Sequence, residues 1–380
     1  MEIFDVYPVY DIQPQRGEGC WIWDSKGNKY LDFYGGHAVI SIGHSHPHFL
    51  QRMQRQMQKM VFYSNAIINP LQTELAEKLG NLAGIPDYQL FLCNSGAEAN
   101  ENALKLASFH TKKKKVISFT KGFHGRTSLA VAVTDNPKIV APINETENAI
   151  ILPLNDEDAL KETFEKEEAA AVIIEGIQGI GGIYEPTQSF MQLIRRLCDE
   201  NEAVFIADSV QCGCGRSGDY FAHDFYGVKA DVYTMAKGIG NGFPIGAVAI
   251  APHIKPWHGM LGSTFGGNHL ACAAALAVVE VMQQENLMSN AKEKGAVLVE
   301  AIKSLPYVKE VRGRGLMVGI EFDFPIKDLR NTLLKEHGVF TGSASNPNVL
   351  RLLPPLNIKK KEVDFFLDKL NTALQKSPTK

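Results

Sequence analysis

The sequence predicts an α/β fold built on a largely parallel sheet, and three observations support this prediction. Runs rich in Val, Ile and Phe alternate along the chain with segments of helical periodicity, which is the pattern of βαβ units. The chain contains neither an internal repeat nor a low-complexity segment. Its 380 residues, of which 45% are hydrophobic and 21% charged, have the composition of an ordinary globular protein.

Six segments in the central part of the chain have the length and composition of buried strands. They are YQLFLC (88–93), KVISFT (115–120), AAVIIE (170–175), AVFIAD (203–208), DVYTMA (231–236) and GAVAIA (246–251). Between the third and the fourth, Phe190, Leu193, Ile194 and Leu197 recur at helical spacing and define the apolar face of a covering helix. The centre of the chain is therefore expected to form a sheet flanked by helices.

The two ends of the chain have a different pattern. Residues 18–33 predict a β-hairpin, and residues 308–323 predict two short strands joined at glycines. A strand at 349–353 and a final helix from about 359 follow. These shorter elements are typical of a small α+β domain assembled from both termini.

We therefore expect three segments. Residues 1–54 form the N-terminal part of the small domain, and residues 55–260 form a large domain that binds the cofactor discussed below. Residues 261–380 contain a connecting helix, at about 267–285, and the remainder of the small domain.

The composition argues against several classes of protein. The net charge is −3 and no basic stripe is present, so nucleic-acid binding is not expected. The longest apolar run, LACAAALAVV at 270–279, is too short to span a membrane, and the N-terminal residues lack a signal-peptide core. Six irregularly spaced cysteines do not suggest a disulfide framework, and Cys212 and Cys214 lack the second pair of a zinc site. A cytoplasmic protein is the expectation.

Polar and charged residues follow five of the predicted strands. Asn94–Glu98 comes after the first strand and Gly122–Arg126 after the second, Glu175 and Asp208 end the third and fourth, and Lys237 follows the fifth. Open α/β sheets bind ligands outside the carboxyl ends of their strands. The sequence therefore predicts a binding site at this edge of the sheet.

The first of these segments has the features of a phosphate site. Ser95 and Glu98 have the spacing of a capping box, and apolar residues then recur at helical spacing. Gly96 and Ala97 leave the N–H groups of the first turn open, and such helix N-termini bind phosphate. An ordinary helix cap without a ligand is the alternative interpretation.

Lys237 and Asp208 extend this interpretation to a cofactor. Lys237 lies between apolar residues and a glycine-rich segment, and a desolvated lysine becomes a nucleophile toward carbonyl groups. Asp208 either forms a structural salt bridge or faces a cationic ring nitrogen, and Glu175 carries the same ambiguity. A phosphate cradle, a strand-end aspartate and a buried lysine together suit pyridoxal 5′-phosphate (PLP), whose ring acts as an electron sink.

Eight longer motifs follow one another along the chain. They are LDFYGGHAVISIGHSHP (31–47), FLCNSGAEANENALKLAS (91–108), GFHGRTSLA (122–130), IIEGIQGIGG (173–182), ADSVQCGCGRSG (207–218), AKGIGNGFPIGA (236–247), STFGGNHLACAAALAV (263–278) and VLRLLPPL (349–356). In this order they resemble the class III (ω-) aminotransferases of fold type I, in particular the acetylornithine and succinylornithine aminotransferase group. The resemblance covers nearly the whole chain and implies a mostly parallel seven-stranded sheet in the large domain.

The resemblance also implies roles for single residues. Lys237 would be the Schiff-base lysine and the proton shuttle, and Asp208 would bind the pyridine nitrogen. The other implied cofactor contacts are Val210 and Phe123 on the two ring faces, Gln211 at the phenolic oxygen, and Ser95, Gly96, Ala97 and the partner subunit's Thr264 at the phosphate. Arg126 and Arg351 would bind substrate carboxylates, which suits the planar guanidinium group, and Glu175 would also contact the substrate. The contribution of Thr264 implies a homodimer with shared active sites.

The implied reaction moves the δ-amino group of an N2-acyl-L-ornithine to 2-oxoglutarate, within arginine biosynthesis. Four positions in three motifs depart from the family pattern. Gly176 and Ile180 replace the usual proline and second glutamate of the Glu175 motif, Ser209 replaces a glutamate, and His37 replaces Ile or Tyr. His37 would contact the acyl arm or a carboxylate, or it is a loop histidine satisfied by backbone.

Ile180 has the largest consequence. In relatives, the missing glutamate is thought to neutralise the arginine at the position of Arg351 while the donor is bound. An unpaired buried charge is costly, so a donor with an extra carboxylate fits better here. We therefore expect a preference for N2-succinyl-L-ornithine over N2-acetyl-L-ornithine.

Several alternatives stay open. The protein could use free ornithine, 4-aminobutyrate or another diamine, or it could be an aminomutase on the same cofactor, which Arg351 disfavours. A PLP-binding protein without turnover is the non-enzymatic alternative. No metal site is predicted, because His44, His46 and His48 belong to a motif of the family loop and have no carboxylate or cysteine at ligand spacing.

Overall fold

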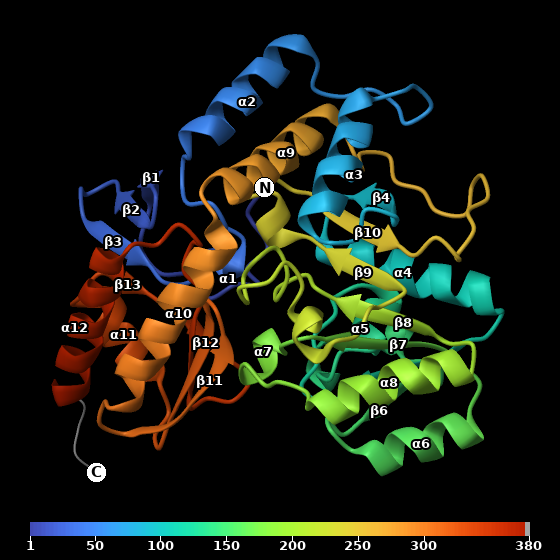
Figure 1. The fold of residues 1–380 in the computed structure, drawn as a ribbon. Coiled ribbons are helices and arrows are strands. Elements are labelled where there is room, and N and C mark those ends of the chain that lie inside the picture. The colour runs from blue at the N-terminus through green and yellow to red at the C-terminus, as the bar shows by residue number, and fades with distance from the viewer. Residues whose placement is uncertain (377–380) are drawn as a thin grey trace.

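A seven-stranded sheet lies at the centre of the computed structural model, which describes residues 1–376 (Figure 1). Its strand order is β4-β10-β9-β8-β7-β5-β6. The strands are β4 (Gln89–Cys93), β5 (Lys115–Phe119), β6 (Ala149–Leu152), β7 (Ala169–Glu175), β8 (Val204–Asp208), β9 (Val232–Met235) and β10 (Gly246–Ile250). Only β10 runs antiparallel to its neighbours, β4 and β9. The mostly parallel seven-stranded sheet is thereby confirmed.

The six strands expected from the sequence lie within one residue of the observed bounds. The seventh strand, β6, has no counterpart among the predicted strands. It contains four residues, AIIL, all only half-buried, and it pairs only with β5 at the edge of the sheet. A short and partly exposed strand carries too little hydrophobic pattern to be recognised.

Helices cover both faces of this sheet, and the central strands are correspondingly apolar except at a few positions. Val172 and Ile174 of β7 share a core with α8 (Gln188–Glu200), whereas Ala171 and Ile173 share a core with α4 (Gly96–Thr111). Figure 1 shows α8 in front of the sheet and α4 behind it. The helical spacing predicted at 190–197 forms the buried face of α8. Other short elements around this sheet are α5 (Ser128–Ala132), α6 (Glu157–Lys166), α7 (Gly179–Gly182), η1 (Pro137–Ile139), η2 (Pro142–Asn144), η3 (Ala222–Tyr226) and η4 (Lys237–Ile239).

Two smaller sheets join the ends of the chain. The first has the order β1-β2-β3-β13 and the second β11-β12-β15-β14. Their strands are β1 (Pro14–Glu18), β2 (Trp21–Asp24), β3 (Lys29–Asp32), β11 (Val308–Arg314), β12 (Met317–Phe322), β13 (Val339–Phe340), β14 (Gly342–Ser343) and β15 (Val349–Leu352). Leu31 pairs in parallel with Val339, so both termini share a sheet, as expected from the sequence. The domain boundaries at 54 and 260 stay a prediction.

The remaining helices pack around these sheets. They are α1 (Gly35–Ala38), α2 (Pro47–Lys59), α3 (Pro70–Leu82), α9 (His269–Gln284), α10 (Leu287–Lys303), α11 (Lys327–Lys335) and α12 (Lys360–Lys376). The connecting helix predicted at about 267–285 is α9, which packs against α2 and α3 and is buried almost throughout. Its many alanines allow this close packing. Within residues 1–376, no helix is long and apolar enough to cross a membrane.

Candidate active site

A cavity of about 390 Å³ lies at the carboxyl ends of the parallel strands, where the sequence predicts a binding site. Its walls come from the segments that follow β4, β5, β8 and β9 and from the end of β7. Ten predicted site residues line it: Ser95, Gly96, Ala97, Phe123, Arg126, Glu175, Asp208, Val210, Gln211 and Lys237. The fold therefore brings together side chains that are up to 142 positions apart (237 minus 95).

Lys237 begins the short helix η4 directly after β9 and lines the cavity. Its φ of 47° lies in the left-handed region, which a residue with a side chain adopts only when its surroundings enforce it. Burial lowers the pKa of its ammonium group, while the negative charges of Asp208 and Glu175 act in the opposite direction. A lysine with a lowered pKa loses its proton more easily, as a nucleophile or proton shuttle requires.

Asp208 ends β8 and is buried among three hydrogen-bond donors. His124 Nδ1 lies 2.7 Å from its Oδ2, and a carboxylate only accepts, so the ring nitrogen is the donor. Asn100 Nδ2 donates to the same oxygen at 2.8 Å, and the Val210 N–H donates to Oδ1 at 3.0 Å. Burial alone would raise the pKa of Asp208, but His124, the Val210 N–H and Lys237 together hold it below its usual range. Asp208 is therefore a carboxylate at neutral pH.

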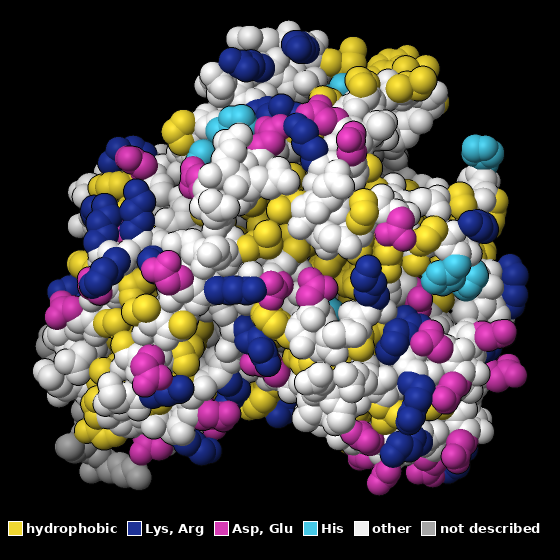
Figure 2. All heavy atoms as spheres, in the orientation of Figure 1, with side chains coloured by type: hydrophobic (Ala, Val, Ile, Leu, Met, Phe, Trp, Pro, Cys, Tyr) yellow, Lys and Arg dark blue, Asp and Glu magenta, His cyan; other side chains and the backbone are white. Residues whose placement is uncertain are grey.

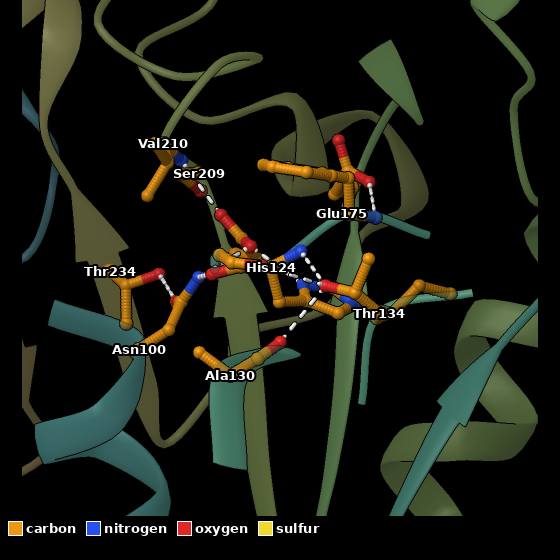
Figure 3. A network of polar contacts seen from close by, with 12 residues as sticks. Asn100, His124, Ala130, Thr134, Glu175, Ser209, Val210 and Thr234 are labelled. Carbon is orange, nitrogen blue, oxygen red and sulfur yellow. Dashed lines mark hydrogen bonds and ion pairs between the residues drawn. The ribbon is translucent and has the colours of Figure 1, made fainter. Parts of the chain in front are cut away.

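Sequence reasoning missed the residues that support Asp208. Figure 3 shows Asn100, His124 and Thr234 in one network, in which Thr234 Oγ1 donates to Asn100 Oδ1 at 2.6 Å. The backbone N–H of His124 also donates to Thr134 Oγ1 at 2.8 Å. His124 belongs to the GFHGR motif, and its position after a predicted strand could have identified it as a site residue. Asn100 and Thr234 lie within regular elements and carry no such signal.

Glu175 ends β7 and its two oxygens bind backbone groups. Oε1 accepts from the Phe123 N–H at 3.0 Å, and Oε2 accepts from the Gly179 N–H at 2.9 Å. Burial and the charge of Asp208 raise its pKa to about 7. These contacts tie the loop that carries Phe123 to the start of α7. They favour a positioning role over the substrate contact that the sequence suggested.

The N-terminus of α4 forms one end of the cavity. Ser95 caps this 16-residue helix, and its Oγ accepts from the Glu98 N–H at 3.2 Å. Gly96 has to be a glycine because a Cβ would lie only 2.6 Å from Cγ1 of Val210. The first turn therefore approaches the Val210 side chain closely, with its N–H groups near the cavity, and can take a phosphate. This cradle, the buried carboxylate of Asp208 and the lysine fit PLP.

Three predicted residues do not line the cavity. Arg351, on β15, lies behind Gln211 and donates to its Oε1 at 3.1 Å. Gln211 in turn donates to the main-chain oxygen of His37 at 3.2 Å, so its amide is engaged at both ends. His37 is exposed, and its Nδ1 is hydrogen-bonded to the Tyr34 hydroxyl. Thr264 is exposed on a loop before α9.

Comparison with known proteins identifies the family. A family model described as Aminotransferase class-III matches residues 5–374. The chain belongs to the class III aminotransferases. Acetylornithine aminotransferase of Caldanaerobacter subterraneus subsp. tengcongensis is 40% identical over 389 aligned residues, which cover 98% of this chain and 97% of that protein. The Bacillus subtilis enzyme of the same name is 39% identical over 380 residues, with 98% and 97% covered.

Solved structures resemble this class III aminotransferase closely. Ornithine aminotransferase from Toxoplasma gondii ME49 has a TM-score of 0.91 at 29% identity, over 98% of this chain and 92% of that one. Acetylornithine aminotransferase from Elizabethkingia anophelis has a TM-score of 0.84 at 31% identity, with 98% and 96% covered. A further Toxoplasma gondii structure is described as having partial occupancy of PLP at its active site. The protein is therefore a class III transaminase that depends on PLP.

Proposed function

We propose that this aminotransferase moves the δ-amino group of an N2-acyl-L-ornithine to 2-oxoglutarate, forming an N-acyl-L-glutamate semialdehyde and glutamate. The placement of the two guanidinium groups carries the proposal. Arg126 lines the cavity, and Arg351 lies directly behind its wall at Gln211. 2-Oxoglutarate has a carboxylate for each arginine, and an N2-acyl-L-ornithine has at least its α-carboxylate for one of them. Arginine biosynthesis in the cytoplasm is the proposed setting.

The cavity residues divide the work of this reaction. PLP, when bound, supplies an electron sink for the bond that breaks at the carbon bearing the amino group. Lys237 would hold the cofactor covalently and then move the proton between that carbon and C4′ of the cofactor. Asp208, kept ionised by its three donors, would hold the proton on the pyridine nitrogen. The first turn of α4, with Ser95, would bind the phosphate.

The identity of the donor's acyl group is inferred from the charges around Arg351. Its Nε donates to the Ser343 carbonyl at 2.6 Å and its Nη1 to Gln211. In the part of the chain that the structure describes, neither Asp nor Glu lies within ion-pair distance of it, and the nearby cavity wall is the apolar Ile180. Burial lowers the pKa of Arg351, which expresses the cost of this desolvated charge. A succinyl arm would bring the missing carboxylate, whereas an acetyl arm would not.

A comparison of donors tests the proposal. We expect kcat/KM with 2-oxoglutarate to be at least about tenfold higher for N2-succinyl-L-ornithine than for N2-acetyl-L-ornithine, because one desolvated ion pair is involved. Ile180→Glu, which supplies an internal carboxylate, should reduce this ratio to about one. A clear preference for the acetyl donor would reject the succinyl assignment. Inactivity with both would reject an acylornithine donor.

Free ornithine is the second candidate donor. The structural resemblance to ornithine aminotransferase from Toxoplasma gondii favours including it. The same coupled assay with L-ornithine and 4-aminobutyrate decides between them. If either compound exceeds both acylornithines in kcat/KM, the acyl group is not the specificity determinant.

We also propose that two copies share their active sites. Thr264 is exposed beside Phe265, whose ring packs on Phe62 at a centroid distance of 5.3 Å. Both rings are exposed, as are Ile67 and Ile68 in the loop after α2, where Figure 2 shows a group of hydrophobic side chains. Patches of this kind mark interaction sites. Sedimentation of the holoenzyme should give a dimer. Thr264→Ala should weaken cofactor binding, and the dimer should stay intact.

A further inference from the structure

Two arginines hold neighbouring carbonyl groups on one stretch of chain beside the cavity wall. Arg351 Nε donates to the Ser343 carbonyl at 2.6 Å, and Arg330 Nη2, from α11, donates to the Thr341 carbonyl at 3.1 Å. Ser343 and Thr341 are two residues apart, in the stretch that leads from β13 into β14. Carbonyl groups of residues i and i+2 in an extended chain point the same way and lie about 7 Å apart. The two guanidinium groups are thus anchored side by side.

Within the described part of the chain, neither guanidinium group has a carboxylate partner. Among residues 1–376, no Asp or Glu oxygen lies within 4.0 Å of a guanidinium nitrogen of Arg351 or Arg330. Within the same residues, Nε of Arg330 and Oγ1 of the buried Thr341 have no hydrogen-bond partner. Buried polar groups without a partner are rare in native proteins and call for an explanation. Here the two atoms without a partner lie on or beside the two arginines, whose positive charges have no carboxylate to balance them.

Tyr34 packs against the strand segment that both arginines hold. A Cβ on Gly342 would lie 2.6 Å from Cε2 of Tyr34 and 3.2 Å from Cβ of Arg351, so the tyrosine ring lies against the strand that both arginines hold. Its hydroxyl is hydrogen-bonded to His37 Nδ1. Burial raises the pKa of Tyr34, while the positive charges of Arg351 and Arg330 act against this rise. Both guanidinium groups therefore act on the same phenol.

From this geometry we propose that Arg330 and Arg351 together bind the terminal carboxylate of the donor's acyl arm, and that Arg330 determines specificity for it. This inference rests on the function proposed above. Two guanidinium groups that are anchored on neighbouring carbonyl groups of one strand can be bridged by one carboxylate, with one oxygen toward each. The carboxylate replaces the neutral Gln211 amide on Arg351, because charged acceptors bind guanidinium more strongly. Glutamate has no acyl arm, so it would contact Arg351 but not Arg330.

The test uses the holoenzyme and three amino donors. Arg330→Gln should lower kcat/KM for N2-succinyl-L-ornithine by at least about tenfold. The values for N2-acetyl-L-ornithine and L-glutamate should stay within about threefold, because neither places a carboxylate at Arg330. Lys327→Gln is the matched control, since it removes one positive charge from an exposed position on the same helix and should leave all three values unchanged.

Two results would overturn the inference. A proportional loss with all three donors would show that Arg330 acts only by holding the Thr341 carbonyl, and an unchanged ratio of succinyl to acetyl donor would show that it plays no part. If Arg330→Gln does not fold, Arg330→Lys decides, because it keeps a charge without the planar fork and should lower the ratio by about threefold. Failure of the proposed function is distinct, because it appears as wild-type inactivity with both acylornithines.

Discussion

Replacing Asp208 with asparagine tests the centre of the site. The carboxylate accepts three hydrogen bonds, from His124 Nδ1, Asn100 Nδ2 and the Val210 N–H. An asparagine at this position has one oxygen, which can accept from His124 and Asn100, but its NH2 group then faces the Val210 N–H. The Val210 N–H and the new NH2 group are then both left without an acceptor, at a cost of at least about 1–3 kcal/mol in the free energy of unfolding. The negative charge against the cofactor is lost as well, which should lower kcat by about 10²–10³-fold.

The assay separates the loss of stability from the loss of chemistry. Kcat is measured with saturating cofactor and donor, and the free energy of unfolding is measured by urea titration of the same preparations. Thr234→Val is the control, because it removes the 2.6 Å bond to Asn100 Oδ1 in the same network and leaves the carboxylate intact. It should cost a similar 1–3 kcal/mol while kcat stays within about threefold. If Asp208→Asn also keeps kcat within that range, the proposed role of the carboxylate is wrong.

Two further predictions concern the cavity wall and the pH dependence of stability. Gly179→Ala places a Cβ 1.8 Å from Oε1 of Gln211, so it should destabilise the protein by about 1–3 kcal/mol, whereas Gly262→Ala, which meets nothing within 4 Å, should not; equal urea midpoints would contradict this. Because the pKa of Glu175 rises from 4.5 to about 7 on folding, its contribution to stability is full below pH 4.5 and is lost as the pH rises through 7. Between about pH 5 and pH 8, the free energy of unfolding should therefore fall more for the wild-type apoprotein than for the Glu175→Gln apoprotein. The hydrogen bond that the variant loses lowers its stability by the same amount at every pH. Parallel stability profiles would count against the raised pKa.

Much of the fold could be predicted because burial leaves a strong pattern. All seven residues of β7 are buried, and the apolar run AAVIIE in the sequence predicts this strand. The short edge strand β6 is half-buried on average and escaped recognition. The pairing of Leu31 with Val339 agrees with a small domain built from both termini. Hydrophobic pattern therefore predicts the interior better than the edges.

The site was predictable only where a polar residue stands out from its surroundings. Asp208 and Lys237 follow apolar strands, so their types alone mark them as unusual. The partners of Asp208 could not be foreseen in this way, because His124 and Asn100 lie 84 and 108 positions away. Which distant side chains meet is decided by strand order and helix packing. The engagement of Gln211 by Arg351, 140 positions apart, was hidden for the same reason.

The pairing of β3 with β13 has a consequence for the order in which the chain matures on the ribosome. Leu31 emerges roughly 300 residues before Val339, and at about 5–20 residues per second the N-terminal hairpin waits about 15–60 s for its last strand. Throughout that interval the edge of β3 is open to wrong partners, because an unpaired strand edge is a template for association. Newly made chains should therefore need protection by a chaperone until the C-terminal third has been synthesised, and loss of that third should leave an insoluble product.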